Sequence, residues 1–192
     1  MRFRMIASIA VPLLAVLALA GPGLLTAAKD YSLTPKIKRG LQIAPVKLNL
    51  RGKNRRLVGL GSYLVNSQAE CVSCHTHPEF VAGHNPYLGE RPARLNTANY
   101  LAGGEAFGPF VTTNLTPDAN GNPGGLTYAV FLERIRTGQT PAHPQFGPFI
   151  QVMPWPSYRE MSDQELRAIY EYLRAIPHAE PGASAAHRKA RS

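Results

Sequence analysis

The sequence predicts a mainly helical domain, and two observations support this. Apolar residues recur at the helical period along residues 56–65 and again along residues 166–173. Between these segments, residues 76–125 are rich in Gly, Pro and Asn and keep no sustained period. An irregular stretch of that length inside a compact domain is typical of functional loops. We therefore expect helices at both ends of the domain and a long loop region between them.

The first and last helices have clear local signals. The first carries Leu57, Leu60 and Leu64 on one side and runs toward the two cysteines of the chain. Gly59 and Gly61 within it would allow a close approach to the last helix, near Tyr170. The last helix begins at a capping box, Ser-Asp-Gln-Glu at residues 162–165, and ends before Pro177.

A middle helix is predicted from Thr127, whose side chain can cap its first turn. Val130, Phe131 and Ile135 form its apolar face. Gly138 stands where a glycine commonly ends a helix.

The N-terminal residues 1–20 have the form of a signal peptide, with a charged start, an apolar run and Ala-Leu-Ala at residues 18–20. Apolar character resumes after Gly-Pro-Gly at residues 21–23, so an uncleaved anchor to about residue 28 is the alternative. Either interpretation places the following domain in the periplasm or otherwise outside the cytoplasm, free or anchored to the membrane.

The basic character of the chain belongs to its flanks. The net charge is +9, yet residues 57–177 contain seven Arg and ten acidic residues, which leaves −3. We interpret residues 29–56 as a basic linker with one short strand near residues 41–50, residues 57–177 as the domain, and residues 178–192 as a disordered basic tail. A mildly acidic domain makes nucleic acid a poor partner. The basic residues 36–56 could touch anionic lipid or an acidic partner, or they could simply be solvated.

The chemistry of the chain is concentrated at Cys71, Cys74 and His75. These are the only two cysteines, and the histidine follows the second directly. Thiols at positions i and i+3 of a helical turn can form thioethers with both vinyl groups of a haem, and the adjacent imidazole can then ligate the iron. The sequence therefore predicts one covalently bound c-type haem.

Other uses of the two cysteines fit less well. A thioredoxin-like pair follows a strand, whereas here a helix precedes it. A zinc site needs four ligands, and there is no second cysteine pair. A disulfide would close too short a loop to stabilise the fold much.

The sixth ligand of the iron decides between an electron carrier and a catalyst. Met153 lies in a loop stiffened by Pro154 and Pro156 and can present its thioether to the iron. Met161 directly precedes the capping box and is better explained as a hydrophobic staple. Trp155 and Tyr158 could donate to a haem propionate or pack against the ring edge.

The other histidines are weaker candidates for ligands. His77 is too close to His75 to reach the opposite face of the same haem. His84 and His143 lie in loops and could ligate in a bis-histidine arrangement, but they suit surface or propionate contacts better. His178 and His187 lie in the tail and are expected to take no part.

The chain resembles monohaem cytochrome c domains, and more specifically the cytochrome c subunits and free cytochromes of bacterial periplasmic dehydrogenases. Beside the haem motif, the segments that carry the resemblance are residues 61–64, 102–104, 113–118, 131–138, 153–154 and 166–177. The resemblance implies an all-α fold with helices packed around one covalent haem and long haem-wrapping loops, in which the first and last helices cross. It also implies His75 and Met153 as the axial ligands.

Two features depart from the resemblance. The interval between His75 and residues 102–104 is long, and residues 79–100 are expected to form an extra loop. The dehydrogenase subunits often carry three haem motifs, whereas this chain has one.

We expect an electron-transfer protein that cycles between Fe(III) and Fe(II), with a dehydrogenase as donor and a terminal oxidase or another cytochrome as acceptor. The alternatives are a haem enzyme with an open sixth position, using His84 or His143 as acid or base, and a sensor in which a ligand displaces Met153.

Overall fold

The computed structural model describes residues 22–141 and 146–182. The predicted signal peptide, residues 1–20, lies outside these ranges. The chain divides into two compact units, residues 1–35 and residues 36–192. Among the described residues, no helix is both long and apolar enough to cross a membrane.

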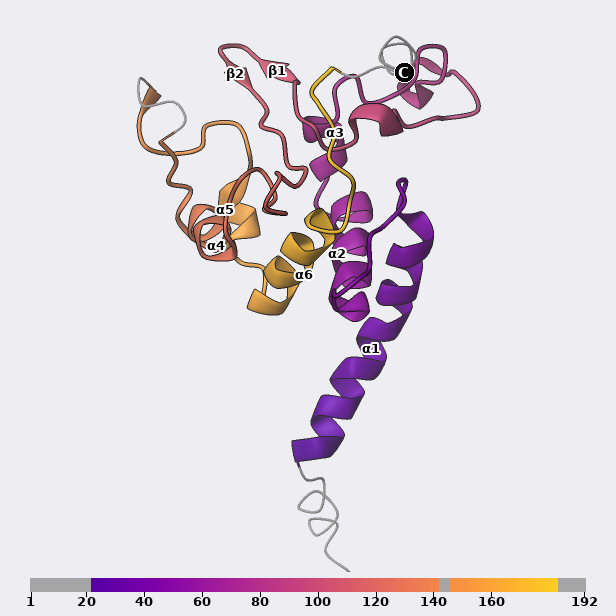
Figure 1. The fold of residues 1–192 in the computed structure, drawn as a ribbon, viewed down its shortest axis with the longest axis vertical. Coiled ribbons are helices and arrows are strands. Elements are labelled where there is room, and N and C mark those ends of the chain that lie inside the picture. The colour runs from indigo at the N-terminus through magenta and orange to yellow at the C-terminus, as the bar shows by residue number, and fades with distance from the viewer. Residues whose placement is uncertain (1–21, 142–145, 183–192) are drawn as a thin grey trace, which may run out of the picture. The chain divides into compact units, whose positions relative to one another are not determined.

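Helices are the main regular structure of the described residues, and long connections join them (Figure 1). The α-helices are α1 (Pro22–Ile43), α2 (Arg55–Ser67), α3 (Cys71–His75), α4 (Tyr128–Thr137), α5 (Trp155–Tyr158) and α6 (Asp163–Leu173). The connections hold two 3-10 helices, η2 (Pro86–Leu88) and η3 (Thr97–Asn99), and a hairpin of β1 (Ala106–Phe107) and β2 (Phe110–Val111). The fold is therefore helix-rich, and it includes a small two-stranded sheet that the expected all-α class lacks.

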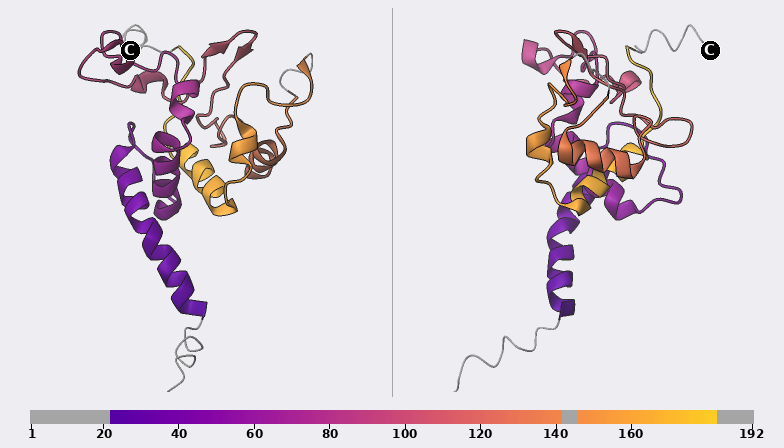
Figure 2. Two further views of the ribbon diagram at one scale, coloured as in Figure 1. Left: turned by 180° about the vertical axis from the view of Figure 1, so that it is seen from behind. Right: turned by 90° about the vertical axis from the view of Figure 1, so that its left-hand side faces the viewer.

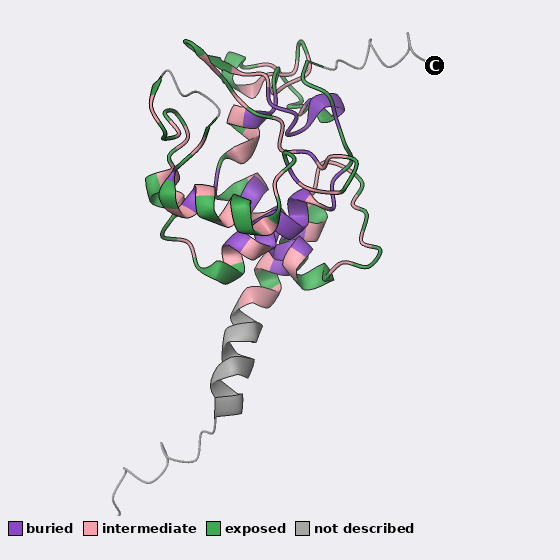
Figure 3. Ribbon diagram, turned by 60° about the vertical axis from the view of Figure 1, so that its left-hand side comes forward, coloured by how far each residue is buried: buried purple, intermediate pink, exposed green. Residues whose placement is uncertain are grey.

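The core of the second unit lies where α2 packs against α6, and buried residues gather there in Figure 3. Gly61 of α2 makes this close approach possible, because a Cβ there would overlap the backbone carbonyl of Ala168 and crowd Tyr172. The predicted crossing of the first and last helices of the domain is confirmed, and Gly61 meets Ala168 and Tyr172 rather than the predicted Tyr170.

The other glycine of α2 faces a different helix. A Cβ at Gly59 would lie 2.8 Å from the carbonyl oxygen of Ile37, and a Cβ at Gly40 would overlap the carbonyl of Gly59. Ser62 adds a 2.7 Å hydrogen bond from its hydroxyl to the carbonyl of Gly40. The part of α1 around Ile37 and Gly40 therefore packs closely against the backbone of α2.

This packing corrects the interpretation of residues 29–56 as a linker. Residues up to Ile43 are helical, and no strand forms in residues 41–50. The following connection is also attached, because the amide of Asn49 donates a 2.8 Å hydrogen bond to the carbonyl of Ala175. The predicted domain boundary at residue 57 thus falls inside a compact unit.

Both predicted ends of α4 and the predicted start of α6 are confirmed, whereas α6 ends at Leu173, before the predicted Pro177. Thr127 caps α4, and Gly138 ends it with φ of 71°. The side chain of Ser162 accepts from the amide of Glu165, whose carboxylate accepts in return from the amide of Ser162, which is a complete capping box. Local side chain to backbone bonds were sufficient to predict these helix ends.

The loop region contains a self-closed excursion, residues 79–96, which we call the extra loop. Phe80 and Leu95 form a β-bridge at its base, and the amide of Asn96 donates to the carbonyl of Glu79 at 2.8 Å. Both views of Figure 2 show the extra loop and the β1–β2 hairpin beyond the end of α2 that leads into α3.

The start of the tail is ordered, which corrects the prediction of disorder from residue 178. Ala179 is buried, and its carbonyl accepts a 2.8 Å hydrogen bond from the side chain of Asn114. His178 bonds the carbonyl of Pro117 at 3.0 Å and the carboxylate of Glu180 at 2.9 Å. Residues 183–192, including His187, lie outside the described residues.

Candidate haem-binding site

The Cys-x-x-Cys-His motif forms a short helix of its own, α3, rather than continuing α2 as the sequence suggested. Helix α2 ends at Ser67, and Glu70 takes a left-handed conformation with φ of 47° just before Cys71. This turn redirects the chain, so that the motif begins a new helical turn.

The two cysteines are free thiols, each partly exposed. The thiol of Cys71 lies 3.6 Å from the carbonyl oxygen of Ala69, and burial of this thiol raises its pKa to about 12. Cys71 is therefore a neutral thiol, not a thiolate ready to bind a metal. Among the described residues, no group of three or more His, Cys, Asp and Glu side chains could hold a metal ion.

His75 is buried and held in one orientation. Its Nδ1 lies 2.8 Å from the carbonyl oxygen of Thr113, and a carbonyl only accepts, so Nδ1 carries the proton. Burial lowers the pKa of this imidazole, and the bond to Thr113 opposes that shift only partly. The ring is therefore neutral, with the lone pair on Nε2 available for a metal.

Gly103 lies between His75 and the carbonyl of Thr113 and allows the two segments to approach closely. The amide of Gly103 donates a 2.7 Å hydrogen bond to the carbonyl of His75, and Gly103 has φ of 76°. A Cβ at Gly103 would lie 2.6 Å from the carbonyl oxygen of Thr113. Gly103 thus allows the segment after β2, which contains Thr113, to pack against the haem motif. The sequence alone did not predict this role.

The segment that carries Met153 is fastened to the turn before the cysteines. Met153 is partly exposed, and its carbonyl accepts from the amide of Trp155 at 2.7 Å, at the start of α5. Five residues after Met153, the hydroxyl of Tyr158 donates a 2.7 Å hydrogen bond to the carbonyl of Ala69. Tyr158 thus ties α5 to the turn before Cys71, and its contact with a haem propionate remains a prediction.

The surroundings of Tyr158 confirm that α5 lies beside the motif. Burial raises the pKa of Tyr158 to about 12, and the neighbouring Cys71 and Cys74 add to that shift. The assignment of Met153 as a ligand remains a prediction, but its segment reaches the part of the chain where that role would place it.

Trp155 packs on the end of α4. A Cβ at Gly138 would overlap the indole ring, and the ring stacks with that of Phe149 at 6.4 Å between centroids. Arg159 lies over the same indole at 5.9 Å. A contact between Trp155 and a haem propionate remains a prediction.

The remaining described histidines have partners of their own. His77 pairs with Glu105 at 2.5 Å. His84 stays within the extra loop, where its Nδ1 lies 2.7 Å from the carbonyl oxygen of Pro92. His143 lies outside the described residues.

A buried polar network joins the loop region to the helix pair, and sequence reasoning missed it as well. The hydroxyls of Tyr100 and Tyr172 lie 2.9 Å apart, and Asn66 bonds both of them, at 2.6 and 3.1 Å. Burial, followed by the neighbouring Tyr172, raises the pKa of Tyr100 well above its usual value. These side chains hold the residues just before Gly103 against α2 and α6.

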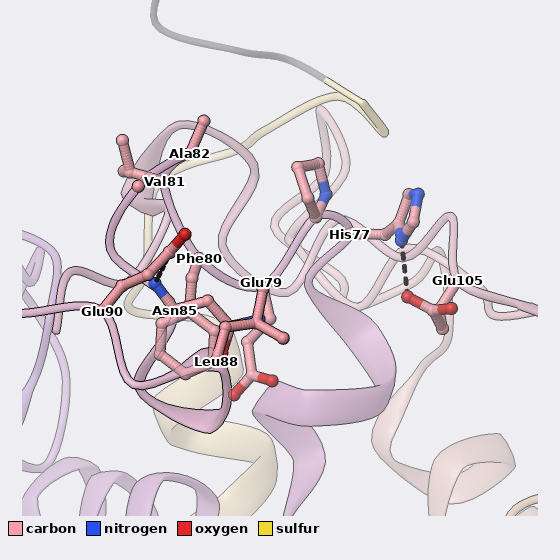
Figure 4. Close-up of a pocket in the computed structure, with 11 residues that line it drawn as sticks. His77, Glu79, Phe80, Val81, Ala82, Asn85, Leu88, Glu90 and Glu105 are labelled. Carbon is pink, nitrogen blue, oxygen red and sulfur yellow. Dashed lines mark hydrogen bonds and ion pairs between the residues drawn. The ribbon is translucent and has the colours of Figure 1, made fainter.

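The extra loop and the residues after α3 line an open cavity of about 440 Å³ (Figure 4). Three carboxylates line it, those of Glu79, Glu90 and Glu105, with His77 on one side. Burial raises the pKa of Glu79, and the negative charge of Glu105 raises it further. None of the predicted ligands lines this cavity.

The donor set at α3 fits a c-type haem. Two unpaired thiols three residues apart precede a neutral imidazole whose Nδ1 is engaged and whose Nε2 faces no hydrogen-bonding partner among the described residues. These are the groups that two thioethers and one proximal ligand require.

Comparison with known proteins agrees with this class of site. No known family profile and no solved structure matches the chain. The chain is 31% identical over 120 residues to the gluconate 2-dehydrogenase cytochrome c subunit of Pantoea cypripedii, in a match that covers 62% of this chain and 23% of that protein. It is 32% identical over 111 residues to a dihaem cytochrome c-type protein of Cereibacter sphaeroides, over 56% of this chain and 32% of that protein.

A further relative is the fructose dehydrogenase cytochrome subunit of Gluconobacter japonicus, 28% identical over 128 residues, or 66% of this chain and 24% of that subunit. The chain thus matches about a quarter of the length of these dehydrogenase subunits. It resembles the cytochrome c subunits of dehydrogenases, as its motifs predicted.

Proposed function

We propose that this chain is an electron-transfer protein that carries one c-type haem on Cys71 and Cys74, with His75 and Met153 as axial ligands. The observation that carries the proposal is the state of His75: buried, neutral, and fixed through Nδ1 by the carbonyl of Thr113. The relatives named as cytochrome c subunits support the same cofactor, and the single motif supports one haem in this chain.

Each residue has a defined task in this proposal. When bound, the haem supplies an iron that cycles between Fe(III) and Fe(II). His75 holds its ring at a set angle through Thr113, so that Nε2 needs little reorganisation between the two oxidation states. Tyr158 ties the segment of Met153 to Ala69 and so limits how far the thioether can move. With both axial positions filled, no substrate binds the iron.

The partners follow from the same resemblance. We infer that a dehydrogenase donates electrons to this chain, since several relatives are named as dehydrogenase cytochrome subunits, and that another cytochrome or a terminal oxidase accepts them. We further propose that the chain works outside the cytoplasm, in the periplasm, because its N-terminal residues 1–20 have the form of a signal peptide.

The absorption spectrum of the holoprotein tests the ligation. We expect the ferric protein to be low-spin, with the weak red band that methionine-ligated haem c shows, and the ferrous protein to bind carbon monoxide slowly. Met153→Ala should open the sixth position, lower the midpoint potential and make carbon monoxide binding fast.

Met161→Ala is the matched control, since Met161 is the other methionine of the domain and lies at the start of α6. It should leave the spectrum unchanged and cost about 1–2 kcal/mol of stability through lost apolar contact. A wild-type protein that is high-spin and binds carbon monoxide rapidly would overturn the carrier proposal in favour of a haem enzyme or a sensor.

A further inference from the structure

Residues 36–56, which we call the basic segment, carry eight Lys or Arg residues and no acidic residue. Residues 57–177 contain seven Arg and ten acidic residues. Positive charge in the second unit is thus concentrated in a short stretch at its start.

The basic segment is part of the folded unit, so its charges keep fixed positions. Ile37 is buried against α2, and Gly40 and Asn49 are tied to Ser62 and Ala175 by backbone-directed hydrogen bonds. A solvated linker would not hold its charges in this way.

Several basic side chains of this segment are exposed to solvent. Lys38 and Arg39 are exposed on α1, between the buried Ile37 and Gly40. Exposure then alternates along residues 46–51, where the apolar residues are partly covered and Lys47 and Arg51 are exposed. The apolar side chains therefore face the unit, while the bases form its outer surface.

Arg55, the last but one residue of the basic segment, lies far from the haem motif. Arg55 belongs to the first turn of α2, whereas Cys71 follows its last turn, and a helix of 13 residues is about 20 Å long. A protein docked around Arg55 would be held away from the site of electron exchange.

Near the motif, four acidic side chains outnumber the two arginines of the extra loop, Arg91 and Arg94. Glu70 directly precedes Cys71, and Glu79, Glu90 and Glu105 line the cavity beside His77. An anionic surface would attract the basic segment and repel this acidic end, so the charge separation would orient the bound protein.

We propose that the basic segment binds an anionic lipid surface and turns the haem motif away from it. Its exposed basic residues lie on α1, on the connection after it and at the start of α2, and each exposed basic side chain near an anionic membrane adds about 1 kcal/mol. The inference does not depend on which residue is the sixth ligand.

Vesicle co-sedimentation of the full-length holoprotein tests this. We expect binding to phosphatidylcholine vesicles that contain phosphatidylglycerol, weaker binding as salt is added, and little binding to phosphatidylcholine alone. The variant Lys38→Gln/Arg39→Gln/Arg55→Gln should bind the anionic vesicles roughly a hundred-fold more weakly.

The variant Arg91→Gln/Arg94→Gln/Arg159→Gln removes the same charge from exposed positions outside the segment and should bind as the wild type does. Unchanged haem spectra in both variants would show that the haem site is intact, whatever its sixth ligand. Equal loss in both variants, or binding that ignores lipid charge, would overturn the proposal. Binding to soluble polyglutamate but not to anionic vesicles would also overturn it, in favour of an acidic protein partner.

Discussion

The backbone carbonyl of Thr113 accepts a 2.8 Å hydrogen bond from Nδ1 of His75, 38 residues earlier in the chain. The proposed iron ligand is therefore oriented by a loop far away in sequence. The glycine between them, Gly103, sets how closely that loop approaches. This arrangement gives the first prediction.

Gly103→Ala should disturb the haem ligand through the backbone. The new Cβ would lie 2.6 Å from the carbonyl oxygen of Thr113, at a residue with φ of 76°, so Thr113 must move. We expect at least about 2 kcal/mol lost in the free energy of unfolding and an altered ferric spectrum.

Gly89→Ala is the control, since Gly89 has the same φ and nothing within 4 Å of the added Cβ. It should cost about 1 kcal/mol through backbone strain alone and leave the spectrum unchanged. Equal costs and unchanged spectra in both variants would show that Gly103 does not position His75.

Cys71→Ser/Cys74→Ser should remove the covalent attachment. We expect any haem in this variant to be extracted by acidified acetone, whereas the wild type keeps its haem. We also expect reduced helical circular dichroism, because the proposed haem would form part of the core around residues 76–125 and its loss would loosen the fold. Haem that resisted extraction from the double variant would contradict attachment at these thiols.

Removal of the basic segment should destabilise the rest of the domain. A chain of residues 57–182 lacks Ile37 and leaves the hydroxyl of Ser62 without its acceptor on Gly40. Compared with residues 36–182, it should lose at least about 3 kcal/mol in denaturant unfolding.

Ser62→Ala in both chains separates the loss of the hydrogen bond to Gly40 from the loss of apolar burial at Ile37. The substitution should cost about 1 kcal/mol in the longer chain and less in the shorter one, where the bond is already absent. Equal stability of the two unsubstituted chains would restore the interpretation of this stretch as a linker.

Glu79 should make stability depend on pH. Its pKa is raised above 4.5 in the folded protein, first by burial and then by the charge of Glu105, so the folded state binds this proton more tightly. That contribution is fully present below the unfolded pKa and is lost as pH rises through the folded pKa. Glu79→Gln should therefore gain stability relative to the wild type as pH rises from 4 to 7.

Unfolding free energies of both proteins measured across that pH range check the sign. The same comparison in a Glu105→Gln background should give a smaller difference, because one of the two causes is gone. A variant that instead lost stability relative to the wild type at neutral pH would contradict the raised pKa.

The sequence was most informative where the signals are local. Both ends of α4 and the start of α6 follow from Thr127, Gly138 and the capping box at Ser162, each of which acts within a few residues. The thiols and imidazole of the haem motif lie within one helical turn, so their spacing alone predicts the cofactor.

Features that depend on distant partners could not be predicted. Helix α1 contains Pro35 and Gly40, which argue against a helix locally, and the packing of Gly40 on Gly59 becomes visible only in three dimensions. The bond from His75 to Thr113 is equally invisible, because neither residue has a sequence signal that refers to the other.

The closed base of the extra loop makes it modular. Phe80 and Leu95 pair directly, so residues 81–94 leave and re-enter the fold at nearly the same point. Their tip exposes Tyr87 and Leu88, which are 82% and 74% accessible. Evolution could lengthen, shorten or exchange such a cassette to suit a new partner while the ligand geometry at His75 is inherited unchanged.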